Sequence, residues 1–356
     1  MNLPTSLAKM PDPKQYVSLR DAETPLFAGI DVGGTNIKIG LVDCQGRTLA
    51  YHTIPTEAER GPEDAAERMG AGVGQVIKQA GAAEQDVVHV GLATPGPLDL
   101  STGMLLTPGN LPDWWNFPIR DRVSQHCRRP VRYANDANAA AYGEYWSGAG
   151  SEFHSMVLLT LGTGVGGGIV VGDTLIEGAH GCGSECGHVL IDSSPDARRD
   201  SLDKAGSLEA YCGAYAVVGR TNDALDAGRP SSLTEVRAER EITPLDVSNA
   251  AEAGDSLARE IVLETARYLA LGIITLIHTI DPDSVVLGGA MTFGGAGHPL
   301  GEEFLQQLRD EVRPRLLHSL QEVLQIDFAQ LGGDAGYIGA AGLARLEYLQ
   351  KNTTDR

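Results

Sequence analysis

The stretch FAGIDVGGTNIKIGLVD, residues 27–43, contains two short apolar runs separated by a glycine turn. Residues 27–30 are strand-like, and apolar and polar residues alternate over Ile37–Leu41 with the period of a strand. Gly33 and Gly34 can adopt positive φ in the turn, and a glycine turn exposes backbone N–H groups that can bind a phosphate. An ordinary Gly-Gly hairpin explains these residues equally well, so this turn alone does not identify a phosphate site.

The same layout occurs a second time in the chain. Ser155–Leu161 is an apolar run, Gly162-Thr163-Gly164 forms a turn, and Gly166–Val171 is the returning strand. Thr35 and Thr163 occupy equivalent places in the two turns. Two halves that each begin with such a hairpin indicate a duplicated domain with one phosphate loop in each half.

The composition is that of a globular protein and argues against nucleic-acid binding. The chain has 356 residues, which is enough for two domains at roughly 100–200 residues each. Its 47 acidic residues outnumber its 28 basic residues and give a formal net charge of −19, whereas affinity for nucleic acid comes largely from Lys and Arg. A nucleotide is not excluded, because backbone donors and Mg²⁺ can hold phosphates in an acidic protein.

The sequence contains no recognisable targeting or membrane-spanning segment. Residues 1–23 are polar, and no run approaches the roughly 18 apolar residues needed to span a bilayer. The chain has 5 cysteines, an odd number that does not suggest a disulfide framework. We therefore expect a cytoplasmic protein with no membrane partner. Residues 1–24 are expected to form a flexible leader, too short for a DNA-binding helix-turn-helix module.

A polar cluster follows a short strand near the middle of the chain. Val131–Tyr133 leads into Ala-Asn-Asp-Ala-Asn-Ala-Ala-Ala at residues 134–141. Asn135 or Asp136 can cap a helix that runs to Trp146, and capping alone would explain both residues. A carboxylate held at a strand-to-helix junction is also suited to act as a general base.

Two loops carry further polar candidates. Residues 107–115, TPGNLPDWW, contain too many turn formers for regular structure, and Asn110 is their candidate polar contact. The alternative is a surface loop pinned by its two tryptophans. Residues 177–188 are glycine-rich, and their polar side chains are Glu185 and His188.

Helical periodicity is clearest in two segments. Pro62 and the acidic residues after it begin a helix that Gly81 ends, and a second helix with a wide apolar face covers about Asp255–Ile280. Val285–Leu287 is then a strand that leads into the glycine turn Gly288-Gly289.

With these segments in order, the sequence resembles the ROK family of sugar kinases and repressors, and most closely its bacterial glucokinase branch. The matching motifs are Asp-Val-Gly-Gly-Thr-Asn-Ile-Lys (31–38), Pro-Gly-Pro (95–97), Pro-Gly-Asn-Leu (108–111), Asn-Asp-Ala-Asn-Ala-Ala (135–140), Gly-Thr-Gly-Val-Gly-Gly-Gly (162–168), Glu-Cys-Gly-His (185–188) and Leu-Gly-Gly-Ala (287–290). Each motif is modest alone, but the full set in the correct order is specific and covers nearly the whole chain beyond the leader.

The resemblance implies an α/β protein with the ribonuclease-H-like fold of actin- and hexokinase-type ATPases, in which ATP and sugar bind in a cleft between two domains. We expect an N-terminal domain over residues 25–134 and a C-terminal domain over residues 135–337. A last helix, about residues 338–356, is expected to pack back on the N-terminal domain. A homodimer, a hexose substrate, and ATP with Mg²⁺ are expected as well.

The same resemblance implies the residues that bind the nucleotide. The two glycine turns hold the phosphates, Asp31 lies near Mg²⁺ with water between them, and Gly288 and Gly289 approach the adenosine. The complete nucleotide set is Asp31, Gly33, Gly34, Thr35, Asn36, Lys38, Gly162, Thr163, Gly164, Gly288 and Gly289.

The residues implied for the sugar are Gly96, Asn110, Asn135, Asp136, Glu185, His188 and Glu209. Asp136 takes the proton from the attacking hydroxyl, since phosphoryl transfer needs positioning, a cation and one poised acceptor. The expected reaction transfers the γ-phosphoryl group of ATP to the 6-hydroxyl of glucose. These contacts do not separate glucose from fructose, mannose, allose or an N-acetylated amino sugar, nor ATP from polyphosphate. A non-catalytic sugar sensor is the remaining alternative.

One family motif is missing. Most members follow Glu-x-Gly-His with Cys-x-Cys-Gly-x-x-Gly-Cys-x-Glu, whose cysteines bind a structural zinc together with the histidine. Aligning Gly206–Glu209 with the end of that motif places Asp200, Leu202 and Ser207 at the cysteine positions. Tetrahedral zinc takes four N or S ligands, so we expect no structural zinc. A less favoured substitute set is Cys182, Cys186, Cys212 and His188.

Overall fold

The computed structural model describes residues 16–354, which form two compact units. Unit 1 is Met1–Ser147 together with Gly333–Arg356, and unit 2 is Gly148–Gly332. Residues 1–15 of the expected leader lie outside the described residues. The part of the leader that is described contacts unit 1, because Tyr16 pairs with Thr48 and the Val17 amide donates to the Thr48 carbonyl at 2.9 Å.

Unit 1 contains a five-stranded sheet in the order β3-β2-β1-β4-β7. β1 (Leu26–Val32), β2 (Asn36–Val42) and β3 (Thr48–Pro55) form an antiparallel meander that contains the predicted hairpin. β4 (Val87–Thr94) and β7 (Val131–Asn135) continue the sheet parallel to β1. The carboxyl ends of β1, β4 and β7 therefore lie at one edge of the sheet.

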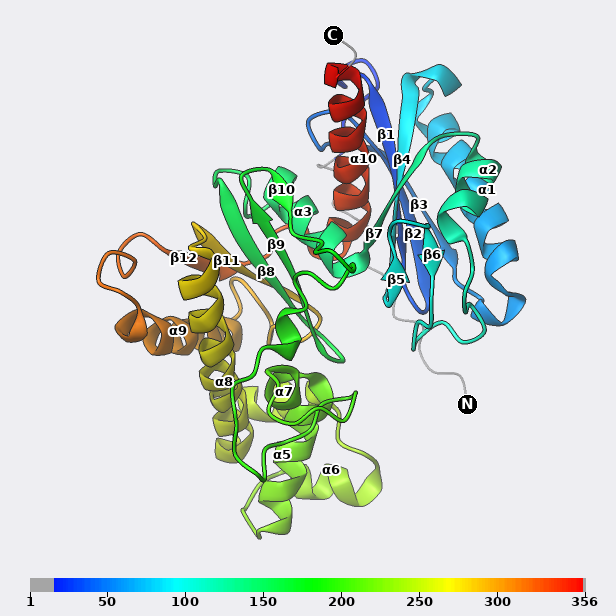
Figure 1. Cartoon of the computed structure of the whole chain (residues 1–356). Helices are drawn as coiled ribbons and strands as arrows, with labels where there is room; N and C mark the ends of the chain where they lie inside the picture. The colour runs from blue at the N-terminus through cyan, green and yellow to red at the C-terminus, as the bar shows by residue number, and fades with distance from the viewer. Residues whose placement is uncertain (1–15, 355–356) are drawn as a thin grey trace. The chain divides into compact units, whose positions relative to one another are not determined.

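Helices cover both faces of this sheet (Figure 1). On one face, α1 (Pro62–Ala80) packs on β2 and β3 and against α2 (Ile119–Cys127). On the other face, α10 (Ala335–Thr354) crosses β1 and β4 and packs along α3 (Asp136–Ser147). A small hairpin of β5 (Leu98–Asp99) and β6 (Met104–Leu105) follows β4.

Glycines in the strands allow α10 to lie directly on the sheet. A Cβ atom on Gly29 would lie 1.8 Å from the Tyr337 carbonyl oxygen, and one on Gly91 would lie 1.8 Å from the Ala340 carbonyl oxygen. Because the clashing atoms belong to the helix backbone, no side chain can be accommodated at either glycine without moving α10.

Unit 2 repeats the strand order of unit 1. Its sheet has the order β10-β9-β8-β11-β12. β8 (Ser155–Leu161), β9 (Val165–Val171) and β10 (Thr174–Leu175) are antiparallel, and β11 (Ser284–Gly289) lies parallel to both β8 and β12 (Gln325–Phe328). The predicted duplication is confirmed at the level of topology, because each unit contains a hairpin, a third antiparallel strand and two parallel strands.

The longest helix of unit 2, α8 (Ser256–Ile280), begins and ends where the sequence predicts. Asp255 caps it by accepting from the Ala258 amide at 3.0 Å, and Asp281 ends it in the left-handed conformation. Among the described helices, only α8 is long and apolar enough to cross a membrane, yet much of its apolar surface belongs to the unit 2 core. The other helices of this unit are α4 (Glu209–Cys212), α5 (Ala214–Asp226), α6 (Leu233–Glu239), α7 (Pro244–Glu252) and α9 (Pro299–Val312).

The first boundary between the units follows α3 and not β7. Residues 135–147 were expected to begin the C-terminal domain, whereas they belong to unit 1. The physical reason is the close packing of α3 on α10: a Cβ atom on Gly339 would lie 1.6 Å from the Ala139 carbonyl oxygen. Asp136 therefore belongs to the same unit as Asp31.

Candidate functional site

Several of the predicted site residues meet at the carboxyl edge of the unit 1 sheet. Asp31 lies near the end of β1, and Asn135 ends β7, where it pairs with Thr94 of β4. A Cβ atom on Gly96 would lie 3.6 Å from Asn135 Nδ2, so the loop after β4 contacts the end of β7. Asp136 follows directly as the first residue of α3.

Asn135 is the main cap of α3, and Asp136 is partly exposed beside it. Asn135 Oδ1 accepts from the Ala137 amide at 2.9 Å and from the Asn138 amide at 3.2 Å. Asp136 Oδ1 accepts from the Ala137 amide at 2.8 Å. Desolvation raises the pKa of Asp136 above its ordinary value, against the opposing hydrogen bonds from Ala137, its own amide and Asn135. A raised pKa makes this carboxylate a better proton acceptor.

Asp31 has a second carboxylate and one lysine as its charged neighbours. Burial raises the pKa of Asp31 to about 6, Lys38 opposes this rise, and the nearby Asp136 adds to it. Lys38 Nζ lies 4.0 Å from Asp31 Oδ2 and donates to the Gly333 carbonyl at 2.6 Å. A Cβ atom on Gly336 would lie 2.5 Å from Asp31 Oδ2, so the first turn of α10 leaves room for this carboxylate through a glycine.

The surroundings of Asp31 fit a magnesium ion that takes most of its ligands from a nucleotide. Mg²⁺ in phosphoryl-transfer sites is usually bound by one or two carboxylates together with phosphate oxygens and water. Within the described residues, no group of three or more His, Cys, Asp or Glu side chains could hold a metal ion. A cation beside Asp31 would therefore be shared with phosphates and not enclosed by the protein.

The first glycine turn is open to solvent. The Gly33 amide donates to the Asn36 carbonyl at 2.9 Å and closes the turn, while Gly34, Thr35 and Asn36 are exposed. A Cβ atom on Gly34 would lie 3.6 Å from the Asn110 carbonyl oxygen. A residue predicted for the sugar thus lies next to the turn predicted for the phosphates.

Only one of the two tryptophans anchors the loop that carries Asn110. Trp114 is fully buried, and its Nε1–H donates to the Ala58 carbonyl at 3.0 Å. Trp115 is 63% exposed. The interpretation that both tryptophans pin the loop is wrong for Trp115, because only Trp114 packs in the unit 1 core.

The second glycine turn joins β8 to β9 in unit 2. The Gly162 amide donates to the Gly164 carbonyl at 3.0 Å, and the first amide of α5, that of Ala214, donates to the Gly162 and Thr163 carbonyls at 2.9 and 3.1 Å. A Cβ atom on Gly164 would lie 2.0 Å from Glu209 Oε2. The turn is therefore supported by α5 and by a carboxylate.

Glu209 is more enclosed than a surface sugar contact would be. It is 8% exposed, and its Oε2 accepts from the Val165 amide at 3.0 Å. Its Oε1 accepts from Ser201 Oγ at 2.7 Å and from the Tyr215 hydroxyl at 3.2 Å. Glu209 thus supports the second glycine turn, and its contact with a sugar stays a prediction.

Glu185 and His188 lie at the two ends of one short turn. The 3-10 segment η4 (Cys186–His188) follows Glu185, and the His188 amide donates to the Glu185 carbonyl at 3.1 Å. Both residues are exposed. His188 Nδ1 lies 3.2 Å from Asp200 Oδ2, so a residue that the sequence analysis treats only as a lost cysteine position contacts a predicted sugar residue.

A cavity of about 310 Å³ begins at the second glycine turn. Its lining is mostly apolar and consists of Gly162, Thr163, Ala214, Pro244, Leu245, Ser248, Ala290, Met291, Phe293 and Gly294. The glycines predicted for the adenosine directly precede this lining: Gly289 has φ 92°, and a Cβ atom on it would lie 2.2 Å from the Leu161 carbonyl oxygen. An apolar slot beside a phosphate turn suits a purine base.

Most of this slot has no recognisable signal in the sequence. Its walls come from the start of α5, the start of α7 and the segment after β11, which are far apart in the chain. Gly162 and Thr163 of the predicted turn line the slot, and the predicted Gly288-Gly289 turn directly precedes it. Apolar residues such as Leu245 and Met291 gave no signal, because they look like ordinary core residues in a sequence.

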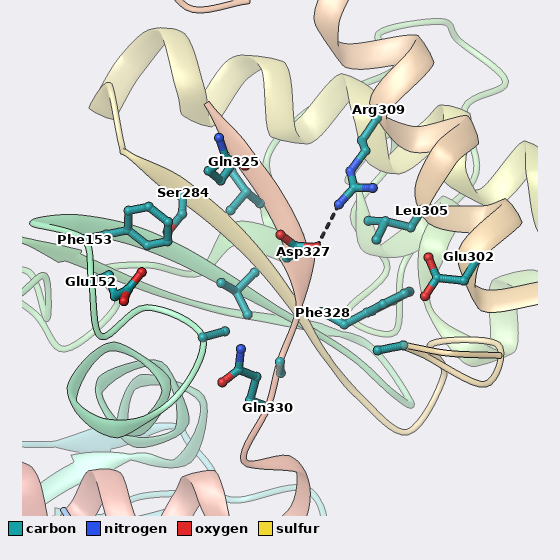
Figure 2. A pocket seen from close by; sticks show the side chains of 15 residues that line it. Glu152, Phe153, Ser284, Glu302, Leu305, Arg309, Gln325, Asp327, Phe328 and Gln330 are labelled. Atoms are coloured by element: carbon teal, nitrogen blue, oxygen red, sulfur yellow. Dashed lines mark hydrogen bonds and ion pairs between the residues drawn. The ribbon is translucent and has the colours of Figure 1, made fainter. Parts of the chain in front are cut away.

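A larger cavity of about 850 Å³ lies elsewhere in unit 2 and contains none of the predicted site residues. Figure 2 shows Phe153 and Glu152 on one side of it and Asp327 of β12 paired with Arg309 of α9 on the other, with an ion-pair distance of 2.7 Å. The lining also includes Glu302. Its carboxylates would repel a phosphate, and its arginine is already paired.

The absence of a structural zinc at the zinc-motif positions stays a prediction, and the side chains at these positions are consistent with it. Leu202 cannot bind a metal, and the cysteines of the substitute set are not gathered into any group of three or more possible ligands in the described chain. Burial raises the pKa of Cys186 and of Cys212 to about 12, so both thiols are neutral when no metal is bound.

Comparison with known proteins shows the family to which this chain belongs. The profile of the ROK family matches residues 27–347. A glucokinase from Halalkalibacterium halodurans is 30% identical over 320 residues, covering 90% of this chain and 94% of that relative. The crystal structure of a ROK hexokinase from Thermus thermophilus is similar with a TM-score of 0.77 at 33% identity, covering 91% of this chain and 99% of that one.

A second solved structure carries ligands. A ROK family glucokinase from Streptomyces griseus, in complex with glucose and AMPPNP, has a TM-score of 0.70 at 32% identity and covers 90% of this chain and 99% of its own. These matches confirm the expected α/β fold of actin- and hexokinase-type ATPases. The protein described here belongs to the ROK family.

Proposed function

We propose that this protein is an ATP-dependent hexose kinase, specifically a glucokinase that transfers the γ-phosphoryl group of ATP to the 6-hydroxyl of glucose. The observation that carries the proposal is the pair of carboxylates at the carboxyl edge of the unit 1 sheet. Asp136 begins α3 with a raised pKa, and it lies close enough to Asp31 to raise the pKa of that carboxyl group as well. The glucokinases and the ROK hexokinase among its relatives support the same activity.

Asp136 is the proposed general base. A base in phosphoryl transfer must be ionised before the reaction and must bind a proton as the hydroxyl attacks. The helix amide of Ala137 holds Asp136 Oδ1 in place, while partial burial raises the pKa of the carboxyl group. Asp136 would accept the proton of the hexose hydroxyl at a carboxylate oxygen.

The glycine turns and the apolar slot are proposed to bind ATP. Exposed backbone at Gly34 and Thr35 can donate to phosphate oxygens, and the slot beside Gly162 and Thr163 can enclose the adenine. Asp31 and Lys38 would hold the Mg²⁺·phosphate group, and Mg²⁺ supplies neutralisation of the charge that develops on the phosphoryl oxygens.

The sugar is proposed to contact a set of mostly polar residues. Carboxylates and amides suit hydroxyl groups because they offer directional acceptors and donors. The proposed sugar contacts are Gly96, Asn110, Asn135, Asp136, Glu185, His188 and Glu209. A homodimer in the cytoplasm remains part of the proposal.

The activity is tested by incubating the purified protein with Mg²⁺ and ATP, or with polyphosphate, and a panel of glucose, fructose, mannose, allose and N-acetylated amino sugars. Product formation is followed by ³¹P NMR. We expect glucose 6-phosphate with ATP as the donor and the highest kcat/KM for glucose. Preference for another hexose would support the proposed kinase activity and would show that the substrate is a sugar other than glucose. Sugar binding by calorimetry without any phosphorylated product would support the non-catalytic sensor instead.

A further inference from the structure

Asp200 is a buried carboxylate whose oxygens are fully engaged. Its side chain has 0% exposure. Oδ1 accepts from the Leu202 amide at 2.9 Å and from the Lys204 amide at 2.8 Å. Oδ2 accepts from Ser207 Oγ at 2.8 Å and lies 3.2 Å from His188 Nδ1. Among the described residues, His188 is the only histidine that contacts the Asp200 side chain.

These contacts determine the direction of the bond to the imidazole. Burial acts to raise the pKa of Asp200, but the hydrogen bonds from Lys204, Ser207, Leu202 and His188 together hold that pKa below its ordinary value. The carboxylate is therefore ionised at neutral pH, and an ionised carboxylate can only accept. The hydrogen atom in the contact must consequently lie on His188 Nδ1, which leaves Nε2 of the neutral ring as an acceptor.

We propose that Asp200 is a positioning residue that holds His188 as the Nδ1–H tautomer and presents its bare Nε2 to a hydroxyl group of the hexose. This inference rests on the proposed function, in which His188 contacts the sugar. Asp200 occupies one of the positions where most ROK proteins are expected to carry a zinc-binding cysteine. In this chain a hydrogen-bonded carboxylate would provide the orientation of the histidine that a metal otherwise provides.

The turn around Asp200 is attached to the backbone next to His188. The Leu208 amide donates to the Val189 carbonyl at 2.8 Å, and the Ile191 amide donates to the Gly206 carbonyl at 2.8 Å. Gly206 has φ 80°, and a Cβ atom on it would lie 1.8 Å from the Asp192 carbonyl oxygen. The turn is therefore fixed in register with the segment that follows the histidine.

The same turn supports a second residue proposed for the sugar. Ser201, which follows Asp200, donates through Oγ to Glu209 Oε1 at 2.7 Å, and its amide donates to the Tyr215 hydroxyl at 3.1 Å. A change at Asp200 can therefore affect sugar binding through His188 directly and through Glu209 by way of Ser201. The experiment must separate these routes.

The first measurement is made on the wild-type protein. Long-range ¹H–¹⁵N NMR spectra of ¹⁵N-histidine-labelled protein report which ring nitrogen carries the proton, and His188→Gln assigns the signal. At about pH 8, where an ordinary histidine is neutral, we expect Nδ1 of His188 to be protonated and Nε2 to be bare. An Nε2–H tautomer in the wild type would overturn the proposal without any reference to activity.

The second measurement uses Asp200→Asn, which keeps the size of the side chain. Its Oδ1 can still accept from the Leu202 and Lys204 amides, but its Nδ2 must donate toward Ser207 or His188. We expect the Nε2–H tautomer in this variant and a KM for glucose raised about 10- to 100-fold, the usual loss for such a supporting partner. The KM for Mg·ATP should stay within about twofold, since the Asp200 side chain itself contacts none of the residues proposed for the nucleotide.

Asp203→Asn is the matched control, because it makes the same chemical change in the same turn at a side chain that is 83% exposed. It should leave both the tautomer and the KM for glucose unchanged. In a protein that already carries His188→Ala, adding Asp200→Asn should raise the KM for glucose by less than about threefold, since the effect of Asp200 passes through the histidine. Full additivity would assign the effect to the Glu209 route and overturn the proposal.

Failure of this inference can be told from failure of the proposed function. A wild-type protein that phosphorylates no hexose contradicts the proposed function, while the NMR result still decides the tautomer. An Asp200→Asn variant with an unchanged tautomer and an unchanged KM for glucose contradicts the positioning role, while the kinase activity stands. If Asp200→Asn does not fold, Ser207→Ala, which removes a single donor to Oδ2, and the wild-type spectrum still decide the question.

Discussion

Asp136 and Asp31 both have raised pKa values, but their immediate contacts differ. Asp136 accepts a helix amide through Oδ1 and is partly exposed, whereas Asp31 faces Lys38 and the glycine at the start of α10. Environments of this kind separate the roles of neighbouring carboxylates in enzymes. The contacts favour proton acceptance for Asp136 and cation binding for Asp31.

Replacing Asp136 tests the first role. Asp136→Asn keeps the acceptor for the Ala137 amide but removes the charge that takes the proton, so kcat should fall by about 10²–10⁴-fold with little change in the KM for ATP. The measurement is steady-state phosphorylation of glucose. Asp121→Asn on α2, where the side chain is 62% exposed, is the control and should retain full activity. A folded Asp136→Asn enzyme with near-normal kcat would show that another group accepts the proton.

Asp31 should affect stability in a pH-dependent way when nucleotide and metal are absent. Its folded pKa of about 6 lies above the ordinary value of 3.8, so the charged form is disfavoured in the native state. The contribution of protonated Asp31 to the stability of the fold is therefore fully present below the ordinary pKa and is lost as pH rises through about 6. Asp31→Asn should raise the free energy of unfolding at neutral pH by on the order of 2 kcal/mol.

Denaturant unfolding of the wild type and of Asp31→Asn from pH 4 to pH 8 provides the measurement. The difference in the free energy of unfolding between the two proteins should shrink as pH falls through about 6 and vanish below about 4. A constant difference across this range would mean that ionisation of Asp31 does not cause it. Saturating Mg·ATP should remove the advantage of the variant, because bound cation favours the charged carboxylate.

At the scale of elements, α10 connects the parts of unit 1 that carry the site. It crosses β1 and β4, packs along α3, and begins with the glycine that accommodates Asp31. Three elements that contribute Asp31, Asn135 and Asp136 are thus held relative to one another by a helix from the end of the chain. Changes in this packing should therefore reach the site.

Gly91→Ala tests the contact between α10 and the sheet. The added Cβ atom would lie 1.8 Å from the Ala340 carbonyl oxygen, so the helix must move, and overpacking of this kind typically costs about 1–3 kcal/mol or more. Gly74→Ala in α1 is the matched control, because nothing lies within 4 Å of its added Cβ atom. It should stabilise the protein by about 0.5–1 kcal/mol through helix propensity. Equal midpoints of unfolding for the two variants would contradict the packing argument.

At the scale of the whole molecule, the two units share one strand order but differ in what stabilises their loops. In unit 1 the predicted site follows strand ends and a helix start. In unit 2 it lies on loops held by the Asp200 network and by Glu209. The described residues offer no set of ligands for a metal that would replace this network.

Chelation should therefore leave the fold intact. After incubation with EDTA the melting temperature should change by less than about 1 °C, and full activity should return when Mg²⁺ alone is added, whereas a structural zinc makes folding depend on the metal. Elemental analysis of protein purified without added metal checks the same point. About one zinc per chain, or unfolding by the chelator, would show that the hydrogen-bonded turn does not stand in for a metal site.

The amino-acid sequence alone determined the features that depend on residues close together in the chain. The two glycine hairpins, the start of α1 at Pro62, the limits of α8 and the strand-to-helix junction at Asp136 follow from turn and capping chemistry, which acts over a few residues. The order of the motifs was enough for the family and for the fold.

The tertiary structure decided what depends on residues far apart in the chain. It assigned α3 to unit 1 through its packing on α10, joined α5, α7 and the segment after β11 into an apolar slot, and left Trp115 exposed beside the buried Trp114. It also added α9 and β12, which were not predicted from the sequence. Asp200 is the clearest case, since a lone aspartate in an irregular loop gives no sign of its partner. Only burial, which removes water and requires each oxygen to find a donor within the protein, brings it to His188.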